Sequence, residues 1–109
     1  MRQTQRPLVV APEFIASPAL RALIEQAAAH RTVVRWADGE QAVVEYDSPV
    51  EADETDDGVE TMIVDVIEVP APGRRRFQAG RINEIRADDP PCFVSSPDGS
   101  RTWSARPSA

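Results

Sequence analysis

The chain has 109 residues and a net charge of −6, and all twelve of its basic residues are arginines. Residues 36–71 contain twelve acids and no base, whereas residues 1–35 and 72–109 each contain three more arginines than acids. This excludes a basic footprint over the whole domain, of the kind that nucleic-acid-binding domains carry, and leaves only local basic patches. A single cysteine and a single histidine exclude an internal disulfide and provide too few ligands for a structural zinc site.

Apolar residues make up 41% of the chain and aromatic residues 6%, so the predicted core is aliphatic. A chain of this length fits one domain, which we expect at residues 17–106 after an extended lead-in at residues 1–16. No run approaches the ~18 apolar residues of a membrane span, and residues 1–7 lack the apolar segment of a signal peptide. We therefore expect a cytoplasmic protein without a membrane partner.

The first predicted element is a helix from residue 18 to about residue 30. Ser17 is a suitable N-cap, and Pro18 fits the first helical position, where its missing N–H costs nothing. Apolar residues then recur with a period of 3.6 and predict one buried stripe, made of Leu20, Leu23, Ile24, Ala27 and Ala28. His30 falls in the last turn, where a positive charge suits the helix dipole.

A hairpin follows at residues 32–37 and 41–46, which are rich in β-branched residues. Asp38-Gly39 between them indicates a two-residue type I′ turn. The predicted register pairs Trp36 with Gln41 and Val34 with Val43.

Residues 47–58 are acidic and poor in apolar residues, and therefore predict a mobile, solvated loop. Its acids also supply oxygen donors for calcium, but their spacing does not match an EF-hand loop. A third interpretation is an acidic docking segment for a basic protein partner. The residues that would carry it are Asp53, Glu54, Asp56 and Asp57.

Residues 60–69 predict a long strand with apolar residues on both faces, which is typical of a central strand. Met62, Val64 and Val66 share one face. Further strands are predicted at residues 74–78, with Phe77 inward, and at residues 79–87. A last hairpin joins residues 92–94 to residues 102–104.

The pattern therefore predicts a mainly β fold: a small antiparallel SH3/Sm-like barrel of about five strands, preceded by one α-helix. Closure into a barrel removes the unpaired edges of a free sheet, and the helix would cap one open end. We expect no catalytic residues, cofactor or metal, because His30 lies near a helix end and Cys92 has no base beside it in the sequence.

Arg74-Arg75-Arg76, followed by Arg81, is the most distinctive run of the chain. On a strand, Arg74 and Arg76 would share one face and Arg75 the other. One interpretation is that these charges neutralise the acidic loop within the fold. The other is a rim for a phosphate-bearing ligand, because the planar guanidinium donates bidentate hydrogen bonds to phosphate. The predicted ligand-binding cations are Arg35, Arg74, Arg76 and Arg81.

The segments HRTVVRWADGE (residues 30–40) and RRRFQAGRINEIR (residues 74–86) resemble the WYL domain. The resemblance covers about residues 19–88, and its most specific part is residues 76–82. It implies an Sm-like, SH3-type barrel preceded by a helix, in a family found in bacterial transcription regulators and phage-defence accessory proteins that sense nucleic-acid or nucleotide-type ligands. The chain departs from the family where Met62-Ile63-Val64 replaces the Trp-Tyr-Leu signature and where Gly80 replaces an Asp.

Two functional hypotheses follow. The first is a non-enzymatic regulatory binding module that recognises a phosphate-bearing ligand or nucleic acid through the arginine-rich rim. The alternative is a small acidic protein–protein inhibitor or adaptor that occupies a basic groove on a nucleic-acid-processing partner. Sm-like barrels pair through strand edges, so a homo-oligomer stays open under either hypothesis.

Overall fold

The computed structural model describes residues 15–27, 31–50 and 52–105. Most of the predicted lead-in at residues 1–16, together with His30 and residues 106–109, lies outside these ranges. The described elements are one helix, six strands and a short 3₁₀ turn: α1 (Pro18–Ala27), β1 (Thr32–Arg35), β2 (Gln41–Val50), η2 (Ala52–Glu54), β3 (Thr61–Ala71), β4 (Ile82–Arg86), β5 (Phe93–Ser95) and β6 (Thr102–Ser104). No helix within these ranges has the length and apolar composition that crossing a membrane requires.

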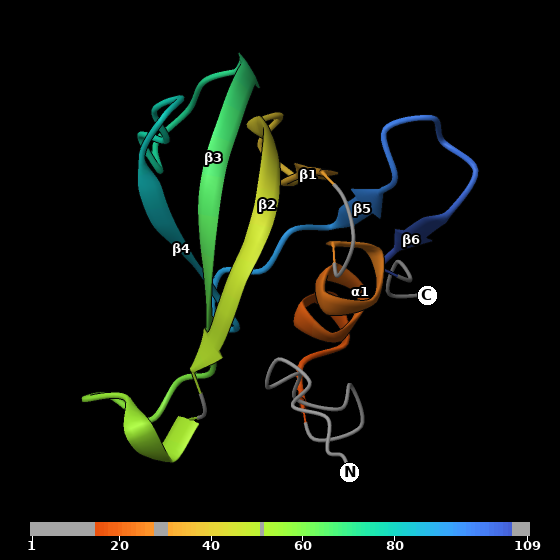
Figure 1. Ribbon diagram of the computed structural model, residues 1–109. Coiled ribbons are helices and arrows are strands. Elements are labelled where there is room, and N and C mark those ends of the chain that lie inside the picture. Colours follow the sequence, from red (N-terminus) through yellow and green to blue (C-terminus); the bar gives the residue numbers. More distant parts are fainter. Residues whose placement is uncertain (1–14, 28–30, 51, 106–109) are drawn as a thin grey trace, which may run out of the picture.

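The six strands form one antiparallel sheet in the order β4-β3-β2-β1-β5-β6 (Figure 1). The predicted mainly β fold with one helix is therefore confirmed, but the sheet is open rather than a closed barrel. Among the described residues, β4 and β6 are edge strands with one neighbour each. The physical reason is that β5 and β6 have only three residues each, and α1 lies between them and the long strands β2 and β3 (Figure 1).

The start of α1 follows the sequence prediction. Ser17 Oγ accepts a hydrogen bond from Leu20 N at 3.3 Å, and Ser17 O accepts one from Arg21 N at 2.9 Å. The predicted stripe is buried as far as it is described, with Leu20, Leu23 and Ile24 at 2% exposure or less. This stripe packs on β1, β2 and β5, so the helix covers one face of the sheet.

The core is aliphatic, as the composition predicts. On β3, Met62, Val64 and Val66 are buried, whereas Ile63 and Ile67 on the other face are half-buried. The strand is therefore fully buried on one face only. Its buried face meets the other core residues of the sheet, which are Val34, Ala42, Val44, Ile85 and Val94.

The predicted hairpin register is wrong by one residue. Arg35 lies opposite Gln41 and Val34 opposite Ala42, and Trp36 N donates to Glu40 O at 2.9 Å. The β1–β2 loop is residues 36–40; its Trp36–Glu40 hydrogen bond encloses residues 37–39, of which Gly39 alone has a positive φ, of 96°. A type I′ turn needs a positive φ at Asp38 as well, but the carboxylate Oδ1 of Asp38 instead accepts a hydrogen bond from Glu40 N at 3.0 Å. This register places Trp36 beside Glu40, and both are buried.

Two connections also differ from their predictions. Strand β2 continues to Val50, so the first part of the predicted acidic loop is strand, and η2 occupies residues 52–54. Residues 74–78 are not a strand, because the chain turns twice between β3 and β4. Arg76 N donates to Gly73 O at 3.1 Å, and the φ of Arg76 is 59°. The alternation of the three arginines between two faces therefore does not apply, although Phe77 is buried as predicted.

The remaining predicted strands are present. Strand β4 lies within the predicted segment 79–87, and β5 and β6 form the predicted last hairpin. Ile82 on β4 is 63% exposed. The backbone N–H of Glu84, on this same edge strand, donates to the side-chain Oδ1 of Asn83 at 2.7 Å.

Candidate functional site

Arg75 is the centre of a partly buried ionic cluster. Its guanidinium donates to Glu40 Oε1 at 2.6 Å, to Asp89 Oδ2 at 2.8 Å and to Asp38 Oδ2 at 3.0 Å. The guanidinium carbon lies 4.5 Å from the centroid of the Trp36 ring, a cation–π geometry. The Arg75 side chain is 12% exposed and that of Glu40 is fully buried. We call these five residues the Arg75 cluster.

Three connections of the fold bring the Arg75 cluster together. The β1–β2 loop supplies Asp38 and Glu40, the β3–β4 connection supplies Arg75, and the turn after β4 supplies Asp89. The backbone of Asp89 is held in place because Trp36 Nε1 donates a hydrogen bond to Asp89 O at 2.9 Å. Glu40 Oε1 also accepts a hydrogen bond from Arg75 N at 3.1 Å, while Glu40 Oε2 is buried without a partner among the described residues. The cluster therefore depends on Arg75 to compensate a buried carboxylate.

The electrostatics of the cluster favour its charged form. Burial alone would lower the pKa of Arg75, but the hydrogen bonds to Asp89, Glu40 and Asp38 outweigh burial and raise that pKa above its usual value. The hydrogen bond from Glu40 N lowers the pKa of Asp38, and Arg75 and Arg74 lower it further. The Arg75 guanidinium thus binds carboxylates of the same chain rather than facing solvent.

Gly73 packs directly against the Glu40 side chain of the Arg75 cluster. A Cβ atom at this position would lie 2.8 Å from Glu40 Oε1 and 2.9 Å from Glu40 Cβ. We predict that Gly73→Ala lowers the free energy of unfolding by about 1–3 kcal/mol, the usual effect of overpacking, because the buried Glu40 side chain must move. Urea denaturation checks this, with Pro72→Ala at the exposed neighbouring position as the control. Equal stability of the two variants would contradict the close approach.

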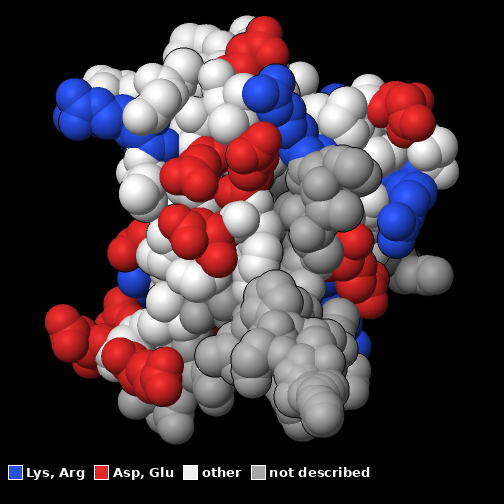
Figure 2. Space-filling view, in the orientation of Figure 1, with Lys and Arg blue, Asp and Glu red and all other residues white. Residues whose placement is uncertain are grey.

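The four cations predicted to bind a ligand have different surroundings. Arg74 is 73% exposed and is held loosely at 3.3 Å from Asp38 and 3.5 Å from Asp89. Arg76 and Arg81 are exposed and form no ion pair with any described residue. Arg35 lies on β1, with its guanidinium 4.5 Å from the Phe93 ring centroid. In the view of Figure 2 the blue side chains are separated from one another rather than gathered in one patch.

The acids that neutralise Arg74 and Arg75 are those of the Arg75 cluster, not those of the segment 47–58. Acids of that segment lie instead at the opposite end of β3. There, Glu54, Asp56, Asp57 and Glu84 line a hollow of about 330 Å³ together with one cation, Arg86. We call it the acidic hollow. Red side chains gather at this end, over the β2–β3 connection at the lower left of Figure 2.

Arg86 neutralises only part of the acidic hollow. Its guanidinium pairs with Asp57 and, at 3.0 Å, with Asp88 outside the hollow. The hydrogen bond from Arg86 lowers the pKa of Asp57, and a similar bond lowers that of Asp88. Glu54 and Asp56 are exposed and form no ion pair with a described residue, while the side chain of Asp53 is not described. No group of three acidic, His or Cys side chains in the described ranges could hold a metal ion.

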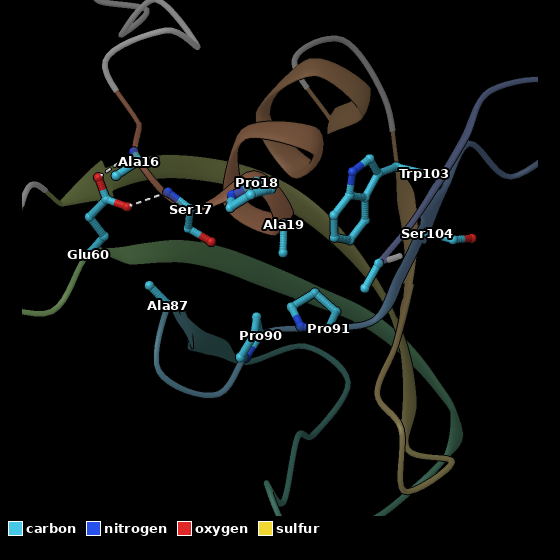
Figure 3. Close-up of a pocket in the computed structure, with 11 residues that line it drawn as sticks. Ala16, Ser17, Pro18, Ala19, Glu60, Ala87, Pro90, Pro91, Trp103 and Ser104 are labelled. Atoms are coloured by element: carbon cyan, nitrogen blue, oxygen red, sulfur yellow. Dashed lines mark hydrogen bonds between the residues drawn. The ribbon is translucent and has the colours of Figure 1, made fainter. Parts of the chain in front are cut away.

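A cavity of about 870 Å³ lies between the start of α1 and residues 87–91 (Figure 3). Its lining is mostly apolar and comes from Ala16, Ser17, Pro18, Ala19, Glu60, Ala87, Pro90, Pro91, Trp103, Ser104 and Ala105. The carboxylate of Glu60 accepts hydrogen bonds from Ala16 N at 2.8 Å and Ser17 N at 2.9 Å, which fixes the entry to α1. We call this cavity the apolar groove.

Sequence reasoning missed the apolar groove. Its lining comes from four separate segments of the chain, so no local pattern marks it. The sequence offers only Trp103 and the Pro90-Pro91 pair, whose proximity arises in the folded chain and could not be predicted from local pattern.

No protein-family model matches the chain, and no curated protein or solved structure matches it significantly. The resemblance to the WYL domain therefore stays a prediction. Any function must be argued from the Arg75 cluster, the acidic hollow and the apolar groove themselves.

Proposed function

We propose that this protein is a non-enzymatic adaptor that docks on a basic surface of a partner protein through the acidic hollow. The observation that carries the proposal is the composition of that hollow, in which four carboxylates face one guanidinium. A basic side chain of a partner would find free carboxylates at Glu54 and Asp56, and the opposite charges would also speed the encounter. Basic surfaces of this kind are typical of proteins that contact nucleic acid.

The distribution of arginines supports the same proposal. Arg75 is enclosed by three carboxylates, and Arg74 is shared between two of them. Two of the twelve arginines are thereby held by carboxylates of the fold itself, and the chain as a whole carries a net charge of −6.

The test is binding of a fluorescein-labelled octa-arginine peptide, followed by fluorescence anisotropy. We expect the double variant Glu54→Arg/Asp56→Arg to weaken binding by roughly tenfold or more, whereas Glu25→Arg/Glu68→Arg weakens it far less. Both variants change the net charge equally, and Glu25 and Glu68 are exposed residues outside the hollow. An equal loss in both variants means that only overall charge attracts the peptide, and the proposal then fails.

A second candidate is the phosphate-binding module of the WYL type, with its Sm-like, SH3-type barrel and regulatory role in the cytoplasm. It is favoured by Arg76 and Arg81, which are exposed and have no carboxylate partner among the described residues. A ten-nucleotide single-stranded DNA would then bind with an affinity that falls steeply with salt, and Arg81→Ala would weaken it while Arg101→Ala would not. Absence of salt-dependent binding removes this candidate.

A further inference from the structure

We infer that the apolar groove holds a short segment of the partner protein, with apolar side chains against Trp103, Pro90 and Pro91 and a basic side chain at Glu60. This inference rests on the proposed function, because it names a second part of the basic partner, which would bind on the face of the sheet opposite the acidic hollow. Its support comes from the shape of the groove, the charge of its described lining and the aromatic face of Trp103.

The shape of the groove suits a chain segment. In Figure 3, Trp103 stands at one end and Glu60 at the other, with α1 along one side and Pro90 and Pro91 along the other. The remaining lining residues that the structure describes are small, and none of them fills the space with a long side chain. The volume of about 870 Å³ lies within the range of known ligand sites, which is roughly 300–1,000 Å³.

The negative charge of Glu60 favours a basic side chain of the partner in the groove. Among the described residues of the lining, Glu60 carries a charge and none is an arginine. Each carboxylate oxygen of Glu60 accepts one backbone hydrogen bond, and a carboxylate oxygen can accept a second. A guanidinium or ammonium group at this end would therefore meet an acceptor that is already held in place.

The Glu60 end of the groove and the acidic hollow lie at the same end of β3 but on opposite faces of the sheet. Glu60 and Ala87 line the groove, whereas their chain neighbours Thr61 and Arg86 line the hollow. Successive side chains of a strand point to opposite faces, so a segment in the groove meets Glu60 and not the carboxylates of the hollow.

The opposite end offers an aromatic face, because Trp103 is half-buried. Apolar side chains laid on Trp103 and on the exposed Pro90 would remove this surface from water.

The experiment uses the full chain and two fluorescein-labelled peptides, one with three leucines followed by two arginines and one in which two glutamates replace the arginines. We expect the arginine peptide to bind roughly tenfold more tightly than the glutamate peptide. A second titration with the unlabelled arginine peptide follows tryptophan emission, which should shift to shorter wavelength as Trp103 leaves water. This shift should be lost in Trp103→Phe, which keeps the apolar contact.

Two variants separate the groove from the acidic hollow. Ala87→Gln fills the groove and should weaken the arginine peptide, while Glu60→Gln should abolish the preference for arginine over glutamate. If the arginine peptide binds, responds to Glu54→Arg/Asp56→Arg, and yet leaves Trp103 emission and the Ala87→Gln affinity unchanged, the groove inference is overturned and the proposed function stands. If no basic peptide binds in any variant, both are overturned.

Discussion

Replacing Arg75 with methionine should lower the free energy of unfolding by about 3–5 kcal/mol, the usual cost of removing one partner of a buried ion pair. The fully buried Glu40 carboxylate would lose its only cation, because the described structure offers it no other. Trp36 would also lose the guanidinium that stacks on it. Urea denaturation followed by far-UV circular dichroism measures the change.

A matched control and a rescue make this prediction specific. Arg74→Met removes a neighbouring arginine of equal charge that is 73% exposed, and should cost only about 0–1 kcal/mol. Adding Glu40→Leu to Arg75→Met should restore much of the lost stability, since the stranded charge is then absent. If Arg75→Met and Arg74→Met are equally stable, the Arg75 cluster does not stabilise the fold.

Leu23→Ala should lower the free energy of unfolding by about 2–5 kcal/mol. The Leu23 side chain is completely buried between α1 and the sheet, and its loss leaves a cavity that a well-packed core fills only in part. Since the first turn of α1 lines the apolar groove, this residue also fixes one side of the groove. The change is measured by thermal and urea denaturation.

Glu25→Ala is the control for Leu23→Ala, because Glu25 is exposed on the same helix. Its effect should stay within about 0.5 kcal/mol, as for most surface substitutions. Similar losses in both variants would indicate that helix propensity, and not burial of the apolar stripe, determines the stability of this region.

The parts of the fold that could be predicted are those set by local pattern. Ser17 and the 3.6-residue period fix α1, and the alternation around Val64 fixes the buried face of β3. The β1–β2 register could not be predicted in this way. Asp38-Gly39 favours a two-residue turn locally, but the hydrogen bond from Glu40 N to Asp38 and the burial of Glu40 favour the longer loop.

The candidate sites were predicted only where their residues are close in sequence. The sequence indicated the acids Glu54, Asp56 and Asp57, but Glu84 joins them only because β4 pairs with β3. Arg75 was predicted to differ from its neighbours, yet its role depends on carboxylates from two distant turns. Contacts of this kind arise from the assembled sheet, which no local pattern contains.

In the part of the chain that the structure describes, β4 has a free edge, and Asn83 on this edge affects how the protein behaves at high concentration. By accepting the backbone N–H of Glu84, its side chain occupies a donor that a neighbouring molecule would need for β-pairing. Ile82 offers an intruding strand an apolar contact on the same edge. Pairing of another molecule with this edge must therefore first break the hydrogen bond between Glu84 N and Asn83. Asn83 thus disfavours fibre-like association through β4.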